Sequence, residues 1–148
     1  MFTALVDQLV FEGDHSLDAW NLRQNAVEWL KNNPCSKDGT HYSSFLDSES
    51  WEEYLLRLSQ DTQWGDHIIL RATAEFLKRN IEVLTPKEML EFHITKIEPE
   101  FSKSGQDEKS LLLGHIGEAH YVSLRSKGLD LQQHDCIIEE EEMEKKIT

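Results

Sequence analysis

A broad helix face that runs directly into a short strand is the feature that most constrains this fold. From Asp66 to Asn80 the residues of one face recur at helical spacing, and they are Ile69, Leu70, Thr73, Ala74, Phe76 and Leu77. Asp66 is a good N-cap residue for this helix. The β-rich run Ile81–Leu84 follows at once. A helix that passes so quickly into a strand lies on the sheet that the strand joins, so the sequence predicts an α+β fold.

Two later segments complete a small predicted sheet. Glu91–Ile97 largely alternates apolar and polar side chains, as a half-buried strand does. Leu111–Arg125 reads LLLGHIGEAHYVSLR, two β-rich runs around a Gly-containing turn, which is typical of a hairpin. Its strands are expected at Leu111–Ile116 and His120–Arg125. We therefore predict a small mixed β-sheet flanked by helices on both sides.

Spacing and capping signals predict the remaining helices. Phe2–Val10 carries apolar residues at i, i+3, i+4, i+7 and i+8, and Leu17–Asn33 shows a similar stripe that ends before a proline. Ser50–Glu53 is a capping box that opens a third helix. Thr85–Glu88 is a second candidate capping box, with proline at the first helical position, and predicts one further helical turn.

The bulk properties fit one soluble globular domain. The chain has 148 residues, of which 39% are hydrophobic and 29% charged. No apolar run approaches the ~18 residues that a membrane span needs, and no secretory signal opens the chain. Cys35 and Cys136 form neither a disulfide framework nor a C-x-x-C pair. We expect a protein of the cytoplasm, with the nucleus as the alternative.

Several function classes find no support. The net charge of −13 argues against nucleic acid as the main partner. The seven histidines are scattered, with no H-E-x-x-H and no Cys/His pair at zinc spacing. Neither G-x-G-x-x-G nor a P-loop occurs. We therefore expect no metal and no cofactor.

His120 is the best candidate for chemistry. It stands where the hairpin turn becomes the second strand, so the strand fixes its backbone while the turn leaves its ring accessible, as a general base requires. A lone histidine is weak evidence, however. From the residues alone, a surface hairpin with an incidental histidine remains the alternative.

Three segments of the sequence lie at Met1–Leu9, Trp64–Leu84 and Glu118–Leu124. Together they resemble the ovarian-tumour (OTU) family of cysteine deubiquitinases. Glu118–Leu124, EAHYVSL, resembles the family's G-E-H-Y-x-S-V/L signature. Trp64–Asp66 followed by Ile68–Leu84 is similar to its W-G, helix, I-x-V segment, and Met1–Leu9 to the helix after its nucleophile. The resemblance implies an OTU-like cysteine-protease fold over residues 1–125, followed by an acidic, disordered tail at 126–148.

The resemblance also implies a function. The expected activity is removal of ubiquitin from proteins, with His120 as the general base. The expected partner is ubiquitin or polyubiquitin, which would lie near Trp64, Gly65 and Tyr121. Ubiquitin's binding face is basic around an apolar patch, and an acidic chain suits it by long-range attraction.

Two departures from the family pattern qualify this expectation. The family carries an Asp-Gly-x-Cys loop just before the residue aligned with Met1, and this sequence does not contain it. The orienting Asn or Asp that commonly follows the histidine by two residues is replaced by Val122. Cys35 lies in a polar loop and is expected to be a surface thiol. The chain as given is therefore expected to be inactive.

Three explanations remain open. The chain starts at an internal methionine downstream of the nucleophile loop, or it is a pseudoenzyme that keeps the scaffold to bind ubiquitin. Val122 favours the pseudoenzyme slightly. The third explanation is an acidic interaction module unrelated to ubiquitin, for which His120 would have no role.

Overall fold

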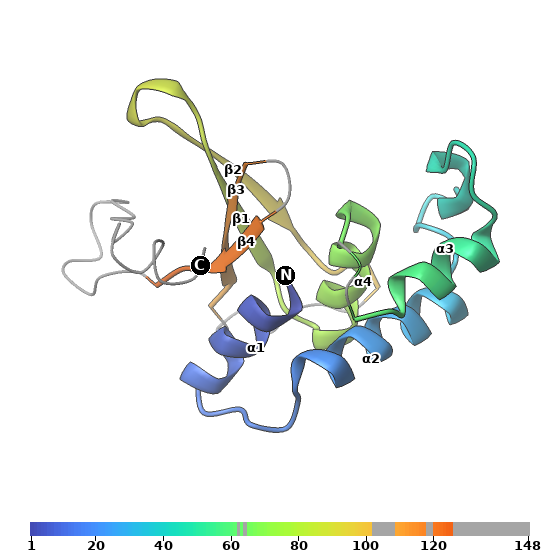
Figure 1. Ribbon diagram of the computed structural model, residues 1–148, viewed down its shortest axis with the longest axis horizontal. Helices are drawn as coiled ribbons and strands as arrows, with labels where there is room; N and C mark the ends of the chain where they lie inside the picture. The colour runs from blue at the N-terminus through green and yellow to red at the C-terminus, as the bar shows by residue number, and fades with distance from the viewer. Residues whose placement is uncertain (62, 64, 102–108, 118–119, 126–148) are drawn as a thin grey trace.

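The computed structural model describes residues 1–61, 63, 65–101, 109–117 and 120–125 (Figure 1). Its elements in chain order are α1 (Phe2–Phe11), α2 (Ala19–Asn32), η1 (Tyr42–Phe45), α3 (Trp51–Leu58), α4 (His67–Leu77), β1 (Ile81–Pro86), η2 (Glu88–Leu90), β2 (Phe92–Ile97), β3 (Leu111–Ile116) and β4 (His120–Ser123). None of the helices within these ranges has the length and apolar character to span a bilayer. The predicted tail at 126–148 lies outside the described residues.

The strands form one mixed sheet in the order β2-β1-β3-β4. β1 pairs antiparallel with β2 and parallel with β3, while β3 pairs antiparallel with β4. Ile81 lies opposite Ile97 on one side and Leu111 on the other, and Leu113 lies opposite Ser123. The predicted α+β architecture with a small mixed sheet is confirmed.

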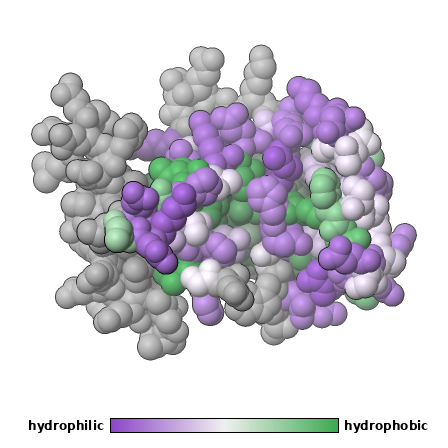
Figure 2. All heavy atoms as spheres, turned by 90° about the horizontal axis from the view of Figure 1, so that it is seen from above, coloured by the Kyte–Doolittle hydropathy of each residue, from purple (hydrophilic) through white to green (hydrophobic). Residues whose placement is uncertain are grey.

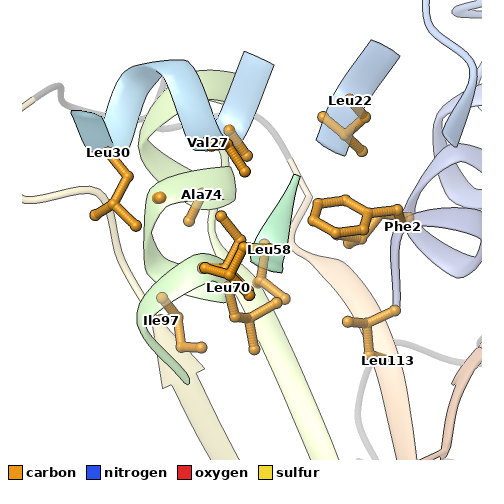
Figure 3. Packing of buried hydrophobic residues seen from close by; sticks show 14 of the residues in the cluster. Phe2, Leu22, Val27, Leu30, Leu58, Leu70, Ala74, Ile97 and Leu113 are labelled. Carbon is orange, nitrogen blue, oxygen red and sulfur yellow. The ribbon is translucent and has the colours of Figure 1, made fainter. Parts of the chain in front are cut away.

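The helices contact the sheet through one face. Residues that share this face in the strand registers are buried in one core cluster, and they are Ile81, Val83, Ile97, Leu111 and Leu113. The same cluster contains apolar residues of α1, α2 and α4 (Figure 3). Leu84 and Val122 are buried on the opposite face and stand outside it. Within the described residues, the expectation of helices on both faces is therefore wrong. A sheet with antiparallel strands at both edges does not need βαβ crossovers over both faces.

Several predicted element ends differ from the structure, and β4, expected at His120–Arg125, ends at Ser123. Helix α4 ends at Leu77 rather than near Asn80, because Lys78 adopts a left-handed conformation (φ 55°) that turns the chain toward β1. The capping box predicted at Thr85–Glu88 is absent. Strand pairing continues to Pro86 opposite Phe92, so Thr85 and Pro86 end β1. A short 3-10 turn, η2, does follow at Glu88–Leu90, but Lys87 precedes it and provides no side-chain cap.

A buried hydrogen bond fixes α3 to the start of α4. Asp66 caps α4 as predicted, since its Oδ1 accepts from the backbone N–H of Ile69 at 3.0 Å. The hydroxyl of Tyr54, a fully buried residue of α3, lies 2.9 and 2.8 Å from the two carboxylate oxygens of Asp66. Burial and the negative charge of Asp66 raise the pKa of Tyr54 well above its usual range. Tyr54 therefore stays a neutral donor and holds the turn that precedes α4.

We predict that Tyr54→Phe lowers the free energy of unfolding by about 1.5–3 kcal/mol, because it removes a buried hydrogen bond to a carboxylate. Tyr42→Phe is the matched control. Tyr42 is 5% exposed, and among the described residues its hydroxyl has no hydrogen-bond partner. Its loss should leave stability unchanged or raise it by up to about 1 kcal/mol. Urea unfolding measures both, and equal losses in the two variants would contradict the assignment.

Candidate active site

The start of α1 lies against the turn before α4. A Cβ atom placed on Gly65 would lie 2.7 Å from Cε and 2.9 Å from Sδ of Met1. A side chain at position 65 would push the flexible end of Met1 aside, so glycine leaves room for the Met1 thioether against the turn. Gly65, predicted to lie near substrate, is thus adjacent to the N-terminal end of α1. Trp64 and Glu118, also named from the sequence, lie outside the described residues.

Tyr121 brings the start of β4 to the same place. Its side chain packs against the core cluster, and its ring stacks on His115 at 4.7 Å between centroids. Burial, and then the negative charge of Asp66, raise the pKa of Tyr121. The phenol is therefore within electrostatic reach of the residue that follows Gly65. The structure thus packs Met1 against Gly65 and sets Tyr121 within electrostatic reach of Asp66.

Arg23 joins the start of α1 to the segment between α3 and α4. It is 7% exposed, and its guanidinium donates to the carbonyl oxygens of Leu58 and Gln63, both at 2.8 Å. It also lies over the ring of Phe2, 4.7 Å from the centroid. The pKa of the Met1 amino group is lowered by burial and then by the charge of Arg23. The helical pattern marked position 23 only as part of α2, because spacing carries no information about distant carbonyl partners.

His120 and Tyr121 point to opposite faces of the sheet. Side chains alternate along a strand, and Tyr121 and Ser123 lie on the face that α1 covers. His120 is the exposed first residue of β4, opposite Ile116, and shares the other face with Val122. Its predicted role as general base is not tested by this placement.

Val122, two residues after His120, has a purely apolar side chain. It is 5% exposed and lies opposite Gly114, where an added Cβ would approach its Cγ2 to 2.9 Å. A valine so enclosed has no atom that can hydrogen-bond an imidazole. The group that commonly orients the family's histidine is therefore missing from this position in the structure as well.

A polar cleft opens beside the first turn of α4. Its volume is about 1320 Å³, and its walls come from α4, the loop before η1 and the end of β2. Asp66 lines it, but Gly65, His120 and Tyr121 do not. Cys35 lies in the loop after α2, half-buried, rather than at a helix N-terminus. No group of three metal-ligating side chains gathers in the described part of the chain.

Comparison with known proteins shows what this arrangement is similar to. The model of the OTU-like cysteine protease family matches residues 1–121. The OVARIAN TUMOR DOMAIN-containing deubiquitinating enzyme 10 of Arabidopsis thaliana is 36% identical over 84 residues, 57% of this chain and 21% of that protein. This chain therefore spans about a fifth of that relative's length.

Two solved structures have the same fold. The viral OTU domain protease from Taggert virus is 13% identical, with a TM-score of 0.64 over 87% of this chain and 74% of its own. An OTU deubiquitinase from Wolbachia pipientis, bound to ubiquitin, is 19% identical, with a TM-score of 0.55 over 82% of this chain and 83% of its own. The family match, which covers most of the chain, shows that the chain belongs to the OTU-like cysteine proteases.

Proposed function

We propose that this chain is the scaffold of an OTU-type deubiquitinase, which cleaves ubiquitin from proteins with a cysteine thiolate just before α1 and His120 as general base. The contact of Met1 with Gly65 at the start of α1, beside Asp66 whose charge reaches Tyr121, carries the proposal. A thiol at a helix N-terminus has a lowered pKa, because the unpaired N–H groups and the macrodipole favour its anion. A cysteine attached to Met1 would stand at that position.

Ubiquitin is the partner that the surface suits. The protein is strongly acidic, with a net charge of −13, whereas ubiquitin's binding face is basic around an apolar patch. The hairpin of β1 and β2 exposes apolar side chains, Met89, Phe92 and Ile94, and acidic Glu88 and Glu91 are exposed beside them. Figure 2 shows hydrophobic surface between hydrophilic surface on the face seen from above. Such a combination fits an apolar patch with a basic rim.

A ubiquitin-binding pseudoenzyme is the second candidate. The enclosed Val122 favours it, since no hydrogen bond from this position can orient His120. A pseudoenzyme would keep the docking surface around Gly65 and Tyr121 without turnover. The two candidates share a partner and differ in chemistry.

The first test uses residues 1–148 and ubiquitin bearing a C-terminal thiol-reactive electrophile. We expect no covalent adduct by intact mass spectrometry, because Cys35 does not lie at the start of α1. The same chain preceded by Asp-Gly-Asn-Cys should gain the mass of one ubiquitin. An adduct on residues 1–148 that is lost in His120→Ala would mean that Cys35 or Cys136 is the nucleophile.

The second test separates enzyme from pseudoenzyme. With Asp-Gly-Asn-Cys in front of Met1, we expect slow hydrolysis of a ubiquitin–fluorophore conjugate, and Val122→Asn should raise kcat by roughly tenfold or more. An amide two residues after His120 lies on the same face of β4 and can hold the imidazole in one tautomer. Val122→Ala is the control for lost volume. A version that turns over only with Val122→Asn would support the pseudoenzyme.

A further inference from the structure

The side chain of Gln8 ties α1 to the last two strands. Its amide nitrogen donates to Ser123 Oγ at 2.7 Å and to the carbonyl oxygen of Leu124, and its amide oxygen accepts from the backbone N–H of Leu112 at 3.2 Å. Gln8 is 9% exposed and Ser123 is 8% exposed. Both amide donors and the amide oxygen are used, so only one placement of the helix satisfies this buried group.

Helix α1 and strand β4 run in the same direction, as Figure 1 shows. Arg125 lies 3.5 Å from the carboxylate of Asp7, and its guanidinium lies 4.1 Å from the ring centroid of Phe11. Residues 7–11 of the helix therefore face residues 123–125 of the strand end. The earlier residues of each element must then face one another.

The distances from this tie to the two element starts match. Gln8 follows Met1 by seven residues, which span about 10 Å along a helix. Ser123 follows His120 by three residues, which also span about 10 Å along a strand. The hydrogen bonds of Gln8 therefore place the start of α1 beside the start of β4. The side chains of Met1 and Tyr121 both pack against the core cluster.

We propose that Gln8 is a positioning residue, which sets the separation between the N-terminal end of α1 and His120–Tyr121 through Ser123 and Leu124. This inference rests on the proposed function, because it assigns the nucleophile to the start of α1. It also gives a structural role to Ser123, the serine of the H-Y-x-S sequence, because the Ser123 hydroxyl accepts a hydrogen bond from Gln8 of α1.

The kinetic test compares Gln8→Leu, which keeps similar volume without polar atoms, with Val27→Ala. Val27 is a buried core residue of α2, so its truncation destabilises the fold away from Gln8. Both changes are made in the chain preceded by Asp-Gly-Asn-Cys and assayed well below each melting temperature. We expect Gln8→Leu to lower kcat at least tenfold with KM within twofold, and Val27→Ala to change neither. Equal kcat in the two variants would overturn the proposal.

Ser123→Ala keeps the test decisive where Gln8→Leu does not fold. It removes one of the acceptors of Gln8 and should lower kcat by roughly threefold without changing KM. An unchanged kcat would count against the positioning role.

A second arm needs no activity, so it separates this inference from the proposed function. In residues 1–148 with methyl-labelled methionine, the Met1 methyl group reports on its contact with Gly65. Gln8→Leu should shift this NMR signal, and Val27→Ala should not. If the chain preceded by Asp-Gly-Asn-Cys, without further substitution, does not hydrolyse its substrate, that result contradicts the proposed function alone. An unmoved Met1 signal in folded Gln8→Leu would contradict the inference.

Discussion

The docking of the first helix on the last two strands is the contact on which the rest of this structure depends. Phe2, Leu5 and Leu9 bury one face of α1 against the core that also contains Leu111 and Leu113. Each fully buried side chain of this size contributes roughly 1.5–3 kcal/mol. Gln8 lies within this apolar contact and joins residues 115 positions apart in the chain. Apolar burial holds the helix on the sheet, and the amide fixes where along the sheet it lies.

This docking makes a site out of element ends. The N-terminal end of α1, the Gly65–Asp66 turn and the start of β4 come from three distant parts of the chain, yet each is held by a buried group. Tyr54 holds Asp66, Arg23 supports the segment before Gly65, and Gln8 holds β4. Side chains supported in this way have little freedom to move, as the proposed catalytic role would require.

The sequence predicted the local structure better than the long-range contacts. The spacing in α4, the Asp66 cap and the Ser50–Glu53 capping box are set within one or two turns, and the structure confirms all three. The Thr85–Glu88 box was wrong because pairing with β2, which lies outside the local pattern, extended the strand to Pro86. The sequence also failed to predict that the helices cover only one face of the sheet in the described residues. Periodicity shows which residues are buried, but it does not show which element packs against them.

The site was only partly predictable. Spacing alone left His120 as a lone histidine, and the family resemblance singled it out together with Gly65 and Tyr121. The structure places Gly65 against Met1 and packs Tyr121 on the core cluster, and neither placement tests their roles. Arg23, Tyr54 and Gln8 were not recognised as supports, because their partners lie 12 to 116 residues away and include backbone carbonyls. Polar residues on the buried face of a helix were the available signal.

The most direct test of ubiquitin docking at this site is an NMR titration of isotope-labelled residues 1–148 with unlabelled ubiquitin. We expect the backbone signals of Gly65, Asp66 and Tyr121 to shift progressively and saturate, because the end of the molecule where they meet is the proposed docking site. Unchanged spectra at high ubiquitin concentration, or shifts that leave out Gly65, Asp66 and Tyr121, would contradict this docking.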